Sequence, residues 1–283
     1  MGDSCKKIKY MNAVTVVKII AALLITNSHF DGLYPSGMSA LATGGMIGNA
    51  LFFFISGYTL YFSINRITNK KDCLAWFSRR VFRIYPSVWI FSILLLTVNH
   101  FADLGGFASI HIKDFFITKY WFINAIIVCY ILYFFILRSK SWKNVILVLI
   151  PVSYVILFLL LLLMHKNGEI GFIIEDIEGR NIWFRYVYLF QVMLWGGLYA
   201  SVLENVKVPT KKQILFNICI SIIAILVYYE MKFLCISYDV YYLQVLVPVC
   251  LTWVVASFWQ FVSSIDYSNI GYKTGEVLKF FRD

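Results

Sequence analysis

Long apolar segments separated by short polar connections dominate this chain of 283 residues. A helix needs about 20 mostly apolar residues to cross the hydrocarbon core of a bilayer. Eight segments meet or nearly meet this length: 13–30, 45–64, 84–101, 121–137, 144–164, 186–203, 213–230 and 239–262. The pattern predicts an all-α fold, a polytopic membrane bundle of about eight transmembrane helices that forms one domain over residues 1–283.

The composition agrees with a membrane location. The chain is 60% hydrophobic and 14% charged, whereas a soluble domain has about 45–50% apolar and about 25% charged residues. The net charge of +10 would point to nucleic acid in a soluble protein. In a membrane protein, basic residues mark cytoplasmic loops and face anionic headgroups. We therefore expect membrane lipids as partners and no nucleic acid.

Lysine and arginine alternate in number from one connection to the next. One set of connections, which includes both ends of the chain, holds eighteen basic residues and the other set holds six. Lys18, inside the first apolar segment, is the remaining one of the 25. Because positive residues are retained inside, this distribution predicts that both termini are cytoplasmic.

His29 follows the first apolar segment and lies near the outer face in this topology. An imidazole titrates near neutral pH, so it accepts a proton from a hydroxyl or carries an acyl group. The alternative is an interfacial histidine without a chemical role. Asn27, Ser28 and Asp31 add polar groups at the same end, and ionisable residues among membrane helices are functional candidates.

An arginine cluster precedes the third apolar segment on the predicted cytoplasmic side. Arg79, Arg80 and Arg83 are spaced so that, on a helix, Arg83 neighbours both of the others. A guanidinium binds phosphate bidentately, so the cluster is suited to a phosphorylated cofactor. Charge alone favours a simpler anchor that binds lipid phosphates. Tyr85-Pro86 is compatible with a helix that restarts there, because proline is tolerated in a first turn.

Two weaker features lie in the second and fourth apolar segments. Ser56-Gly57-Tyr58 allows close approach of another helix or of a thin ligand, and the two interpretations are equally compatible with the sequence. Trp121, at the start of the fourth segment, belongs to an aromatic belt or lines a tunnel. The six cysteines show no paired spacing, and the sequence has no metal cluster, Walker loop or G-x-S-x-G motif.

Together these features resemble the acyltransferase family 3 membrane proteins, which O-acetylate surface polysaccharides and related glycans in bacteria. The resemblance rests on His29 after the first segment, FFFISGY in the second, RRVFRIYP before the third and Trp-Phe at the start of the fourth. It covers Val14 to about Tyr133, and beyond that only the pattern of spans agrees.

The resemblance implies that an acetyl group is taken from cytosolic acetyl-CoA, as acyl donor, and delivered to a glycan or lipid-linked oligosaccharide outside a bacterial inner membrane. His29 would be the catalytic base or acyl carrier, and Arg80 and Arg83 would hold the CoA phosphates. Further candidates on the donor's path are Arg79, Ser56, Tyr58 and Trp121. No metal is implied.

The chain departs from the family pattern in two respects. Thr15 and Lys18 occupy positions where members often carry an aspartate and an arginine, so the acidic partner is missing. Members usually have about ten spans, and residues 275–283 look like the lead-in to another span. The sequence thus predicts a chain lacking its last one or two helices. The alternatives are an exporter or transporter of a glycan or small acid, and an inactive remnant.

Overall fold

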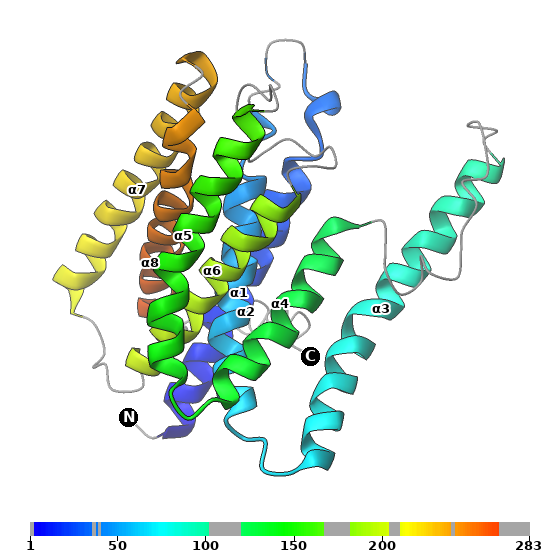
Figure 1. Cartoon of the computed structure of the whole chain (residues 1–283), viewed down its shortest axis with the longest axis vertical. Coiled ribbons are helices and arrows are strands. Elements are labelled where there is room, and N and C mark those ends of the chain that lie inside the picture. Colours follow the sequence, from blue (N-terminus) through cyan, green and yellow to red (C-terminus); the bar gives the residue numbers. More distant parts are fainter. Residues whose placement is uncertain are drawn as a thin grey trace. The chain divides into compact units, whose positions relative to one another are not determined.

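The structure is a computed structural model that describes residues 3–35, 38, 41–101, 120–166, 182–203, 210–238 and 241–265. These ranges contain eight α-helices and two 3₁₀ helices, and no β-strand, which confirms the all-α class (Figure 1). The elements are α1 (Asp3–Asn27), η1 (Asp31–Leu33), α2 (Gly45–Ile64), α3 (Lys70–Phe101), α4 (Trp121–Arg138), α5 (Trp142–Lys166), α6 (Ile182–Leu203), α7 (Lys211–Tyr238), η4 (Tyr241–Leu246) and α8 (Val247–Ser264).

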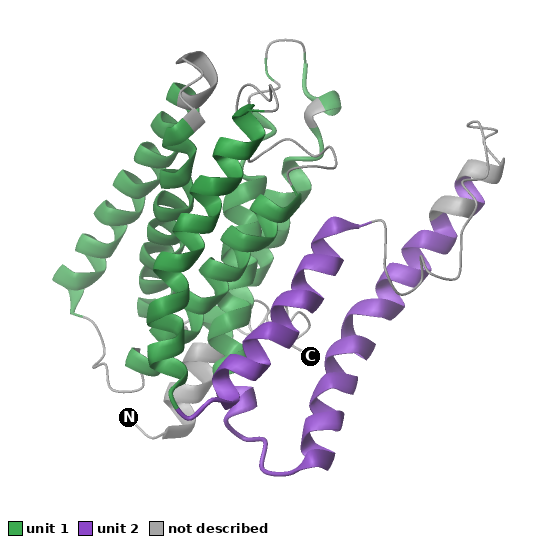
Figure 2. Ribbon diagram, in the orientation of Figure 1, with its two compact units in different colours: residues 1–61, 141–283 green, residues 62–140 purple. Residues whose placement is uncertain are grey.

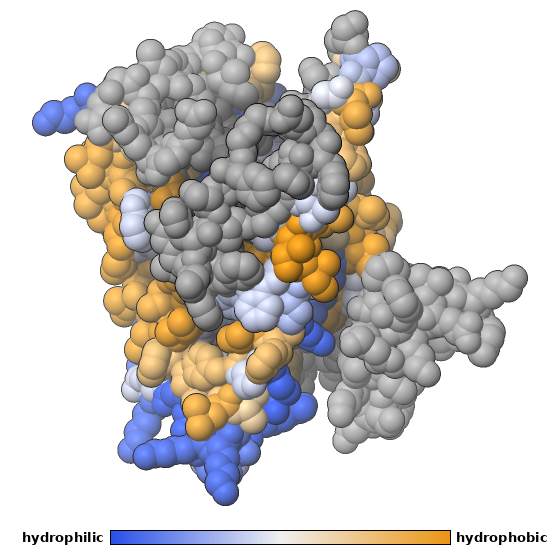
Figure 3. Space-filling model, turned by 90° about the vertical axis from the view of Figure 1, so that its right-hand side faces the viewer, coloured by the Kyte–Doolittle hydropathy of each residue, from blue (hydrophilic) through white to orange (hydrophobic). Residues whose placement is uncertain are grey.

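Five segments in the described ranges are long and apolar enough to cross a membrane: α2, α4, α5, most of α7, and η4 continued by α8. The apolar part of α1, Asn12–Asn27, is shorter. Hydrophobic residues cover much of the described surface in Figure 3, with hydrophilic residues gathered at its lower end in that view. The protein is therefore an integral membrane protein. The number of eight spans and the orientation remain predictions, and the predicted lead-in at 275–283 lies outside the described residues.

Helix α3 is longer than the third predicted segment, 84–101, and includes the basic residues that precede that segment. It begins at Lys70 and continues through Pro86 to Phe101, so no new helix begins at Tyr85-Pro86. The start is set by local capping: the Asp72 N–H donates to Asn69 Oδ1 at 2.8 Å, and Thr68 N–H and Oγ1 donate to Asp72 Oδ2 at 3.3 and 2.8 Å. This reciprocal pattern satisfies N–H groups of the helix N-terminus.

The chain divides into two compact units (Figure 2). Unit 1 comprises residues 1–61 and 141–283, and unit 2 comprises residues 62–140. In unit 1, α8 packs against α7, α6 and α1, and α5 packs against α6. The single-domain interpretation from the sequence remains a prediction.

Two glycines set how α2 and α6 cross in unit 1. A Cβ atom at Gly57 would collide with the carbonyl oxygen of Met193, and one at Gly196 would collide with the carbonyl oxygen of Phe54. Small residues let helix backbones in membranes approach this closely. The helices are therefore held together by backbone packing at two reciprocal points.

Unit 2 is organised around an aromatic cluster between α3 and α4. The ring of Trp76 is 2% exposed and lies 5.3 Å from that of Phe134, centroid to centroid. Phe77 lies 4.9 Å from the same Phe134 ring. Ring pairs at these separations contribute about 0.5–1.5 kcal/mol each beyond the burial of their area. This cluster fixes the first half of α3, which carries the arginines.

Candidate functional site

His29 lies two residues beyond the end of α1 in unit 1, and its side chain is exposed. Its backbone N–H donates to the carbonyl oxygen of Thr26 at 3.1 Å, which continues the last turn of the helix. The preceding Ser28 donates its hydroxyl to the Ile25 carbonyl at 2.7 Å. The imidazole is therefore open to a ligand, while its backbone is held by the helix.

Asn27, two residues before His29, makes three hydrogen bonds to the connection between α1 and α2. Its Nδ2 donates to the carbonyl oxygens of Leu41 and Thr43 at 2.8 and 3.1 Å, and its Oδ1 accepts from the Tyr34 hydroxyl at 2.6 Å. The Thr43 and Tyr229 hydroxyls lie 3.2 Å apart, which ties the same connection to α7. The sequence placed Asn27 among polar groups near His29, and the structure gives it the role of holding this connection.

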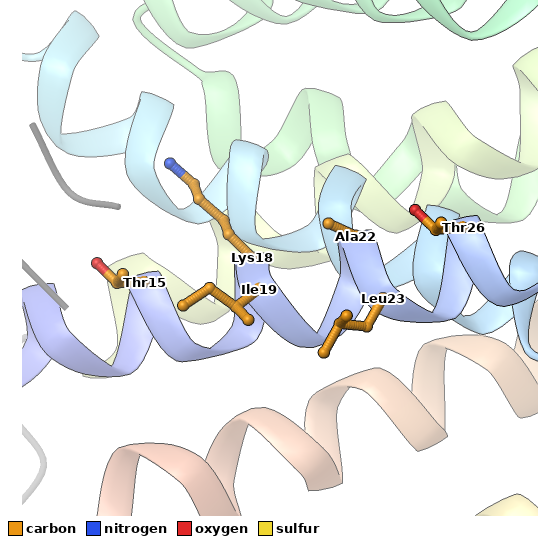
Figure 4. Close-up of a pocket in the computed structure, with 6 residues that line it drawn as sticks. All are labelled: Thr15, Lys18, Ile19, Ala22, Leu23 and Thr26. Carbon is orange, nitrogen blue, oxygen red and sulfur yellow. The ribbon is translucent and has the colours of Figure 1, made fainter. Parts of the chain in front are cut away.

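A pocket of about 240 Å³ runs along one face of α1 (Figure 4). The residues that line it recur at helical spacing: Thr15, Lys18, Ile19, Ala22, Leu23 and Thr26. In Figure 4 the side chains of Thr15, Lys18 and Thr26 extend from one side of α1, that of Leu23 extends from the other, and that of Ile19 lies across the helix. The pocket thus has a polar and an apolar side. It ends at Thr26, whose carbonyl group accepts the His29 N–H.

Ser56, Gly57 and Tyr58 lie in the buried middle of α2. Tyr58 is 4% exposed and packs on the Trp259 ring with centroids 4.7 Å apart, and Ser56 is also 4% exposed. Gly45, the first residue of α2, lies beside Ser28. Ser56 is about 16 Å farther along the helix. Helix packing accounts for Gly57, and the structure does not bring Ser56 or Tyr58 to His29. Their contact with a cofactor remains a prediction.

The three arginines in unit 2 do not share one environment. Arg80 is half-buried: its Nη2 donates to Ser63 Oγ at 3.2 Å, and its guanidinium lies 5.4 Å from the centroid of the Trp76 ring. Burial lowers the pKa of Arg80, but a guanidinium remains charged at neutral pH. Arg79 and Arg83 are exposed. Arg80 therefore contacts other residues of the protein through its guanidinium, whereas the side chains of Arg79 and Arg83 are exposed.

Arg138 and Trp121 also lie in unit 2, at the two ends of α4. Arg138, which the sequence analysis used only to orient the chain, donates to the Ile67 carbonyl at 2.8 Å and so holds the connection between α2 and α3. Trp121 is the first residue of α4 and its ring lies 5.9 Å from that of Phe122, edge to face. A tunnel-lining role for Trp121 remains a prediction.

Two ionisable residues that are not among the site candidates predicted from the sequence lie within the helices of unit 1. Lys18 lines the pocket on α1. An amine within an apolar segment is itself a functional signal, so the sequence alone could have made Lys18 a candidate. Arg185, assigned to an outer connection, is 7% exposed in the first turn of α6. Its position directly before the apolar segment 186–203 and after Trp183 and Phe184 was the available signal. Burial itself depends on packing between helices and has no local pattern.

Comparison with known proteins gives one match. A family model described as an acyltransferase domain, Acyl_transf_3, matches residues 11–281, which is nearly the whole chain. No curated protein and no solved structure matches the chain. No group of three or more histidine, cysteine, aspartate or glutamate side chains suited to a metal ion occurs in the described part of the chain.

Proposed function

Because the chain belongs to acyltransferase family 3, we propose that it moves an acetyl group from cytosolic acetyl-CoA to a hydroxyl group of a surface glycan. The family and the apolar helices make it a membrane acyltransferase. The proposal adds the acetyl donor, a glycan or lipid-linked oligosaccharide acceptor on the outer side, and a bacterial inner membrane. The observation that carries it is the pocket on α1, whose last lining residue, Thr26, lies one helical turn before the exposed His29.

The donor side is supported by the charge distribution. The arginines lie in the first half of α3, within the basic segment that the positive-inside rule assigns to the cytoplasm. Guanidinium groups bind phosphates bidentately, and the nucleotide end of CoA carries several. Arg79, Arg80 and Arg83 therefore supply cationic groups on the side where acetyl-CoA is made.

The pocket on α1, taken by itself within unit 1, suits a slender chain such as a pantetheine arm. From Thr15 to Thr26 the helix rises about 16 Å, and the lining combines two hydroxyl groups and an ammonium with aliphatic side chains. A pantetheine arm has amide groups separated by methylene groups, so it presents the matching chemistry. In this proposal Lys18 donates to a carbonyl oxygen of the arm and the thioester lies near His29.

The reaction transfers the acetyl group without an additional reactant. His29 takes the proton from the acceptor hydroxyl as that oxygen attacks the thioester carbonyl carbon. The new C–O bond forms, the C–S bond breaks, and the proton leaves with the CoA thiolate. In the other route the imidazole attacks first: the C–S bond breaks, CoA leaves as its thiol with the imidazole proton, and an acyl-histidine forms. The acceptor hydroxyl then attacks the acyl carbon, the N–C bond breaks, and the hydroxyl proton returns to the imidazole. Both routes require His29 and are consistent with its exposed imidazole.

The test is transfer of labelled acetyl groups from acetyl-CoA to surface glycan by membranes that contain the wild-type chain or His29→Ala. Removal of a general base lowers the rate by about 10²–10⁴-fold. His165→Ala is the matched control, because His165 is likewise an exposed histidine at the end of an apolar helix. Equal transfer by wild type and His29→Ala excludes His29 from the mechanism. Flux of a glycan or small acid without acetyl transfer would favour an exporter.

A further inference from the structure

The connection between α1 and α2 exposes large apolar side chains directly after His29. Four of them have exposed fractions between 45% and 78%: Phe30, Leu33, Met38 and Leu41. We call these four side chains the apolar patch. The chain has no lysine or arginine between Asp31 and Gly45, so the connection carries no cationic side chain for an anionic partner. Grouped apolar side chains on a surface mark a contact with protein or membrane.

Two tight turns group these side chains in pairs. The Leu33 N–H donates to the Phe30 carbonyl at 2.9 Å, and the Leu41 N–H donates to the Met38 carbonyl at 2.9 Å. In turns of this 3₁₀ type, the side chains at positions i and i+3 lie on the same side. Each turn therefore presents two apolar groups together.

Asn27 holds both turns at the end of α1. Its Nδ2 donates to the carbonyl oxygen of Leu41, which closes the second turn. Its Oδ1 accepts from the hydroxyl of Tyr34, which follows the first turn directly. The apolar patch is thus fixed to the same helix end as His29.

The apolar part of α1 is shorter than the hydrocarbon core of a bilayer. From Asn12 to Asn27 it is about 24 Å long, whereas the core is about 30 Å thick. By the same rise per residue, α2 is about 30 Å long. A short apolar segment needs its flanking residues to make up the length. At this end of α1 the flanking residues are those of the apolar patch, which continues the exposed apolar surface at Leu23.

We propose that the apolar patch is a membrane-binding surface, whose side chains lie at the boundary between lipid headgroups and acyl chains. Apolar groups gain free energy when they leave water, and side chains at a bilayer surface reach this boundary at a depth of about 5–10 Å. The patch needs no cationic group there, because it contacts acyl chains and not phosphates. His29 directly precedes Phe30, so its imidazole is held at the surface of the bilayer.

This position has a consequence for the acceptor, which rests on the proposed function. An imidazole at the bilayer surface meets the hydroxyl groups of molecules that are attached to the membrane. The acceptor is therefore a glycan that is still attached to the membrane when it receives the acetyl group.

Photo-crosslinking of the full chain in phosphatidylcholine vesicles tests the lipid contact. The photoreactive residue p-benzoylphenylalanine replaces Leu33 or Leu41, one in each turn. Position 32 is the matched control, because Gly32 belongs to the first turn, a Cβ there has no atom within 4 Å, and its side chain points about 120° away from that of Leu33. We expect lipid adducts from positions 33 and 41 and few from position 32.

Two results of this experiment would overturn the membrane-binding surface. One is an equal yield of lipid adducts from all three positions, because the connection would then have no side that faces lipid. The other is adducts to a second copy of the chain without lipid adducts, which would make the patch a protein contact. Both results are independent of acetyl transfer.

Acetyl transfer tests the consequence for the acceptor. The surface glycan is offered either in the membranes that carry it or after it has been cut from them, at equal glycan concentration. The wild type should transfer faster to the attached form. The double variant Leu33→Ser with Leu41→Ser should lose this preference, because a misplacement of about 1 Å costs up to about 10²-fold in rate. Both side chains are more than half exposed, so serine does not disturb the packing.

The outcomes separate this inference from the proposed function. A preference for the attached glycan that survives in the double variant overturns the role of the patch in the choice of acceptor. If the wild type transfers acetyl groups to neither form, the proposed function and this consequence fail together. The crosslinks then still decide whether the patch contacts lipid.

Discussion

Replacement of Asn27 by alanine tests how the region around His29 is held. The substitution removes three hydrogen bonds: two from Nδ2 to the Leu41 and Thr43 carbonyls and one accepted from the Tyr34 hydroxyl. An average hydrogen bond contributes about 1 kcal/mol net, which gives about 3 kcal/mol for the three. The bond to Leu41 is exposed, so water replaces it at little cost. We therefore expect Asn27→Ala to lower the free energy of unfolding by about 2 kcal/mol.

The assay is equilibrium unfolding of the purified chain in detergent, together with hydrogen exchange of the connection between α1 and α2. Tyr34→Phe removes only one of the three bonds and should cost about 1 kcal/mol. The two side chains share that bond, so the double variant should cost about 1 kcal/mol less than the sum of the single variants. Exchange should quicken in the connection and stay unchanged in α5.

Two results would contradict this account. One is a loss of stability below about 0.5 kcal/mol in Asn27→Ala, which is within the range of ordinary surface substitutions. The other is strict additivity of Asn27→Ala and Tyr34→Phe, which would mean that their hydrogen bond contributes nothing. The first result would mean that the connection does not help to position His29, and the second would remove only the bond to Tyr34 from the account.

Three further predictions concern packing, the basic connection and pH. Gly57→Ala should destabilise the bundle by more than the roughly 1–3 kcal/mol typical of overpacking, because the added Cβ meets a backbone carbonyl that no side-chain rotation can move. Equilibrium unfolding in detergent measures this loss of stability. Arg138→Met should increase proteolysis of the connection between α2 and α3, since it removes the donor to the Ile67 carbonyl, and an unchanged cleavage rate would refute this role. Hydrogen bonds from Thr68 lower the pKa of Asp72. The stabilisation by the Asp72 cap is therefore present above the unfolded-state pKa and is lost as pH falls through the folded-state pKa. The difference in free energy of unfolding between wild type and Asp72→Asn should vanish in acid.

Segment length predicted the strongly apolar helices well and α3 poorly. Helix α2 matches the predicted segment 45–64 at both ends, because its apolar run and its helix coincide. In α3 they do not: lysine and arginine are good helix formers, so the helix extends through the basic segment that hydropathy assigns to a connection. The cap at Asn69 and Asp72 was a readable start signal. Pro86 was a misleading one, because membrane helices tolerate proline in their interior.

The candidate site was predictable in its residues and not in their environments. The spacing of Arg79, Arg80 and Arg83 places them on neighbouring faces of a helix, but it does not tell which of them meets another element. Arg80 is held by Ser63, seventeen positions earlier on a different helix. Likewise, the spacing of Thr15, Lys18 and Thr26 predicts one face of α1, while the pocket on that face depends on what packs around it.

The different environments of the arginines decide how substitutions in this cluster are to be interpreted. Arg80 shares Ser63 Oγ with Trp76, whose Nε1 donates to the same oxygen at 3.1 Å. Replacing Arg80 therefore removes a charge near the donor and also disturbs the contact between the end of α2 and the aromatic cluster that fixes α3. A rise in KM in such a variant does not distinguish phosphate binding from a displaced helix. Arg79 is exposed and lies one helical turn from Arg83, so its replacement changes the charge without this contact. Phosphate recognition is thus tested more directly at Arg79 than at Arg80.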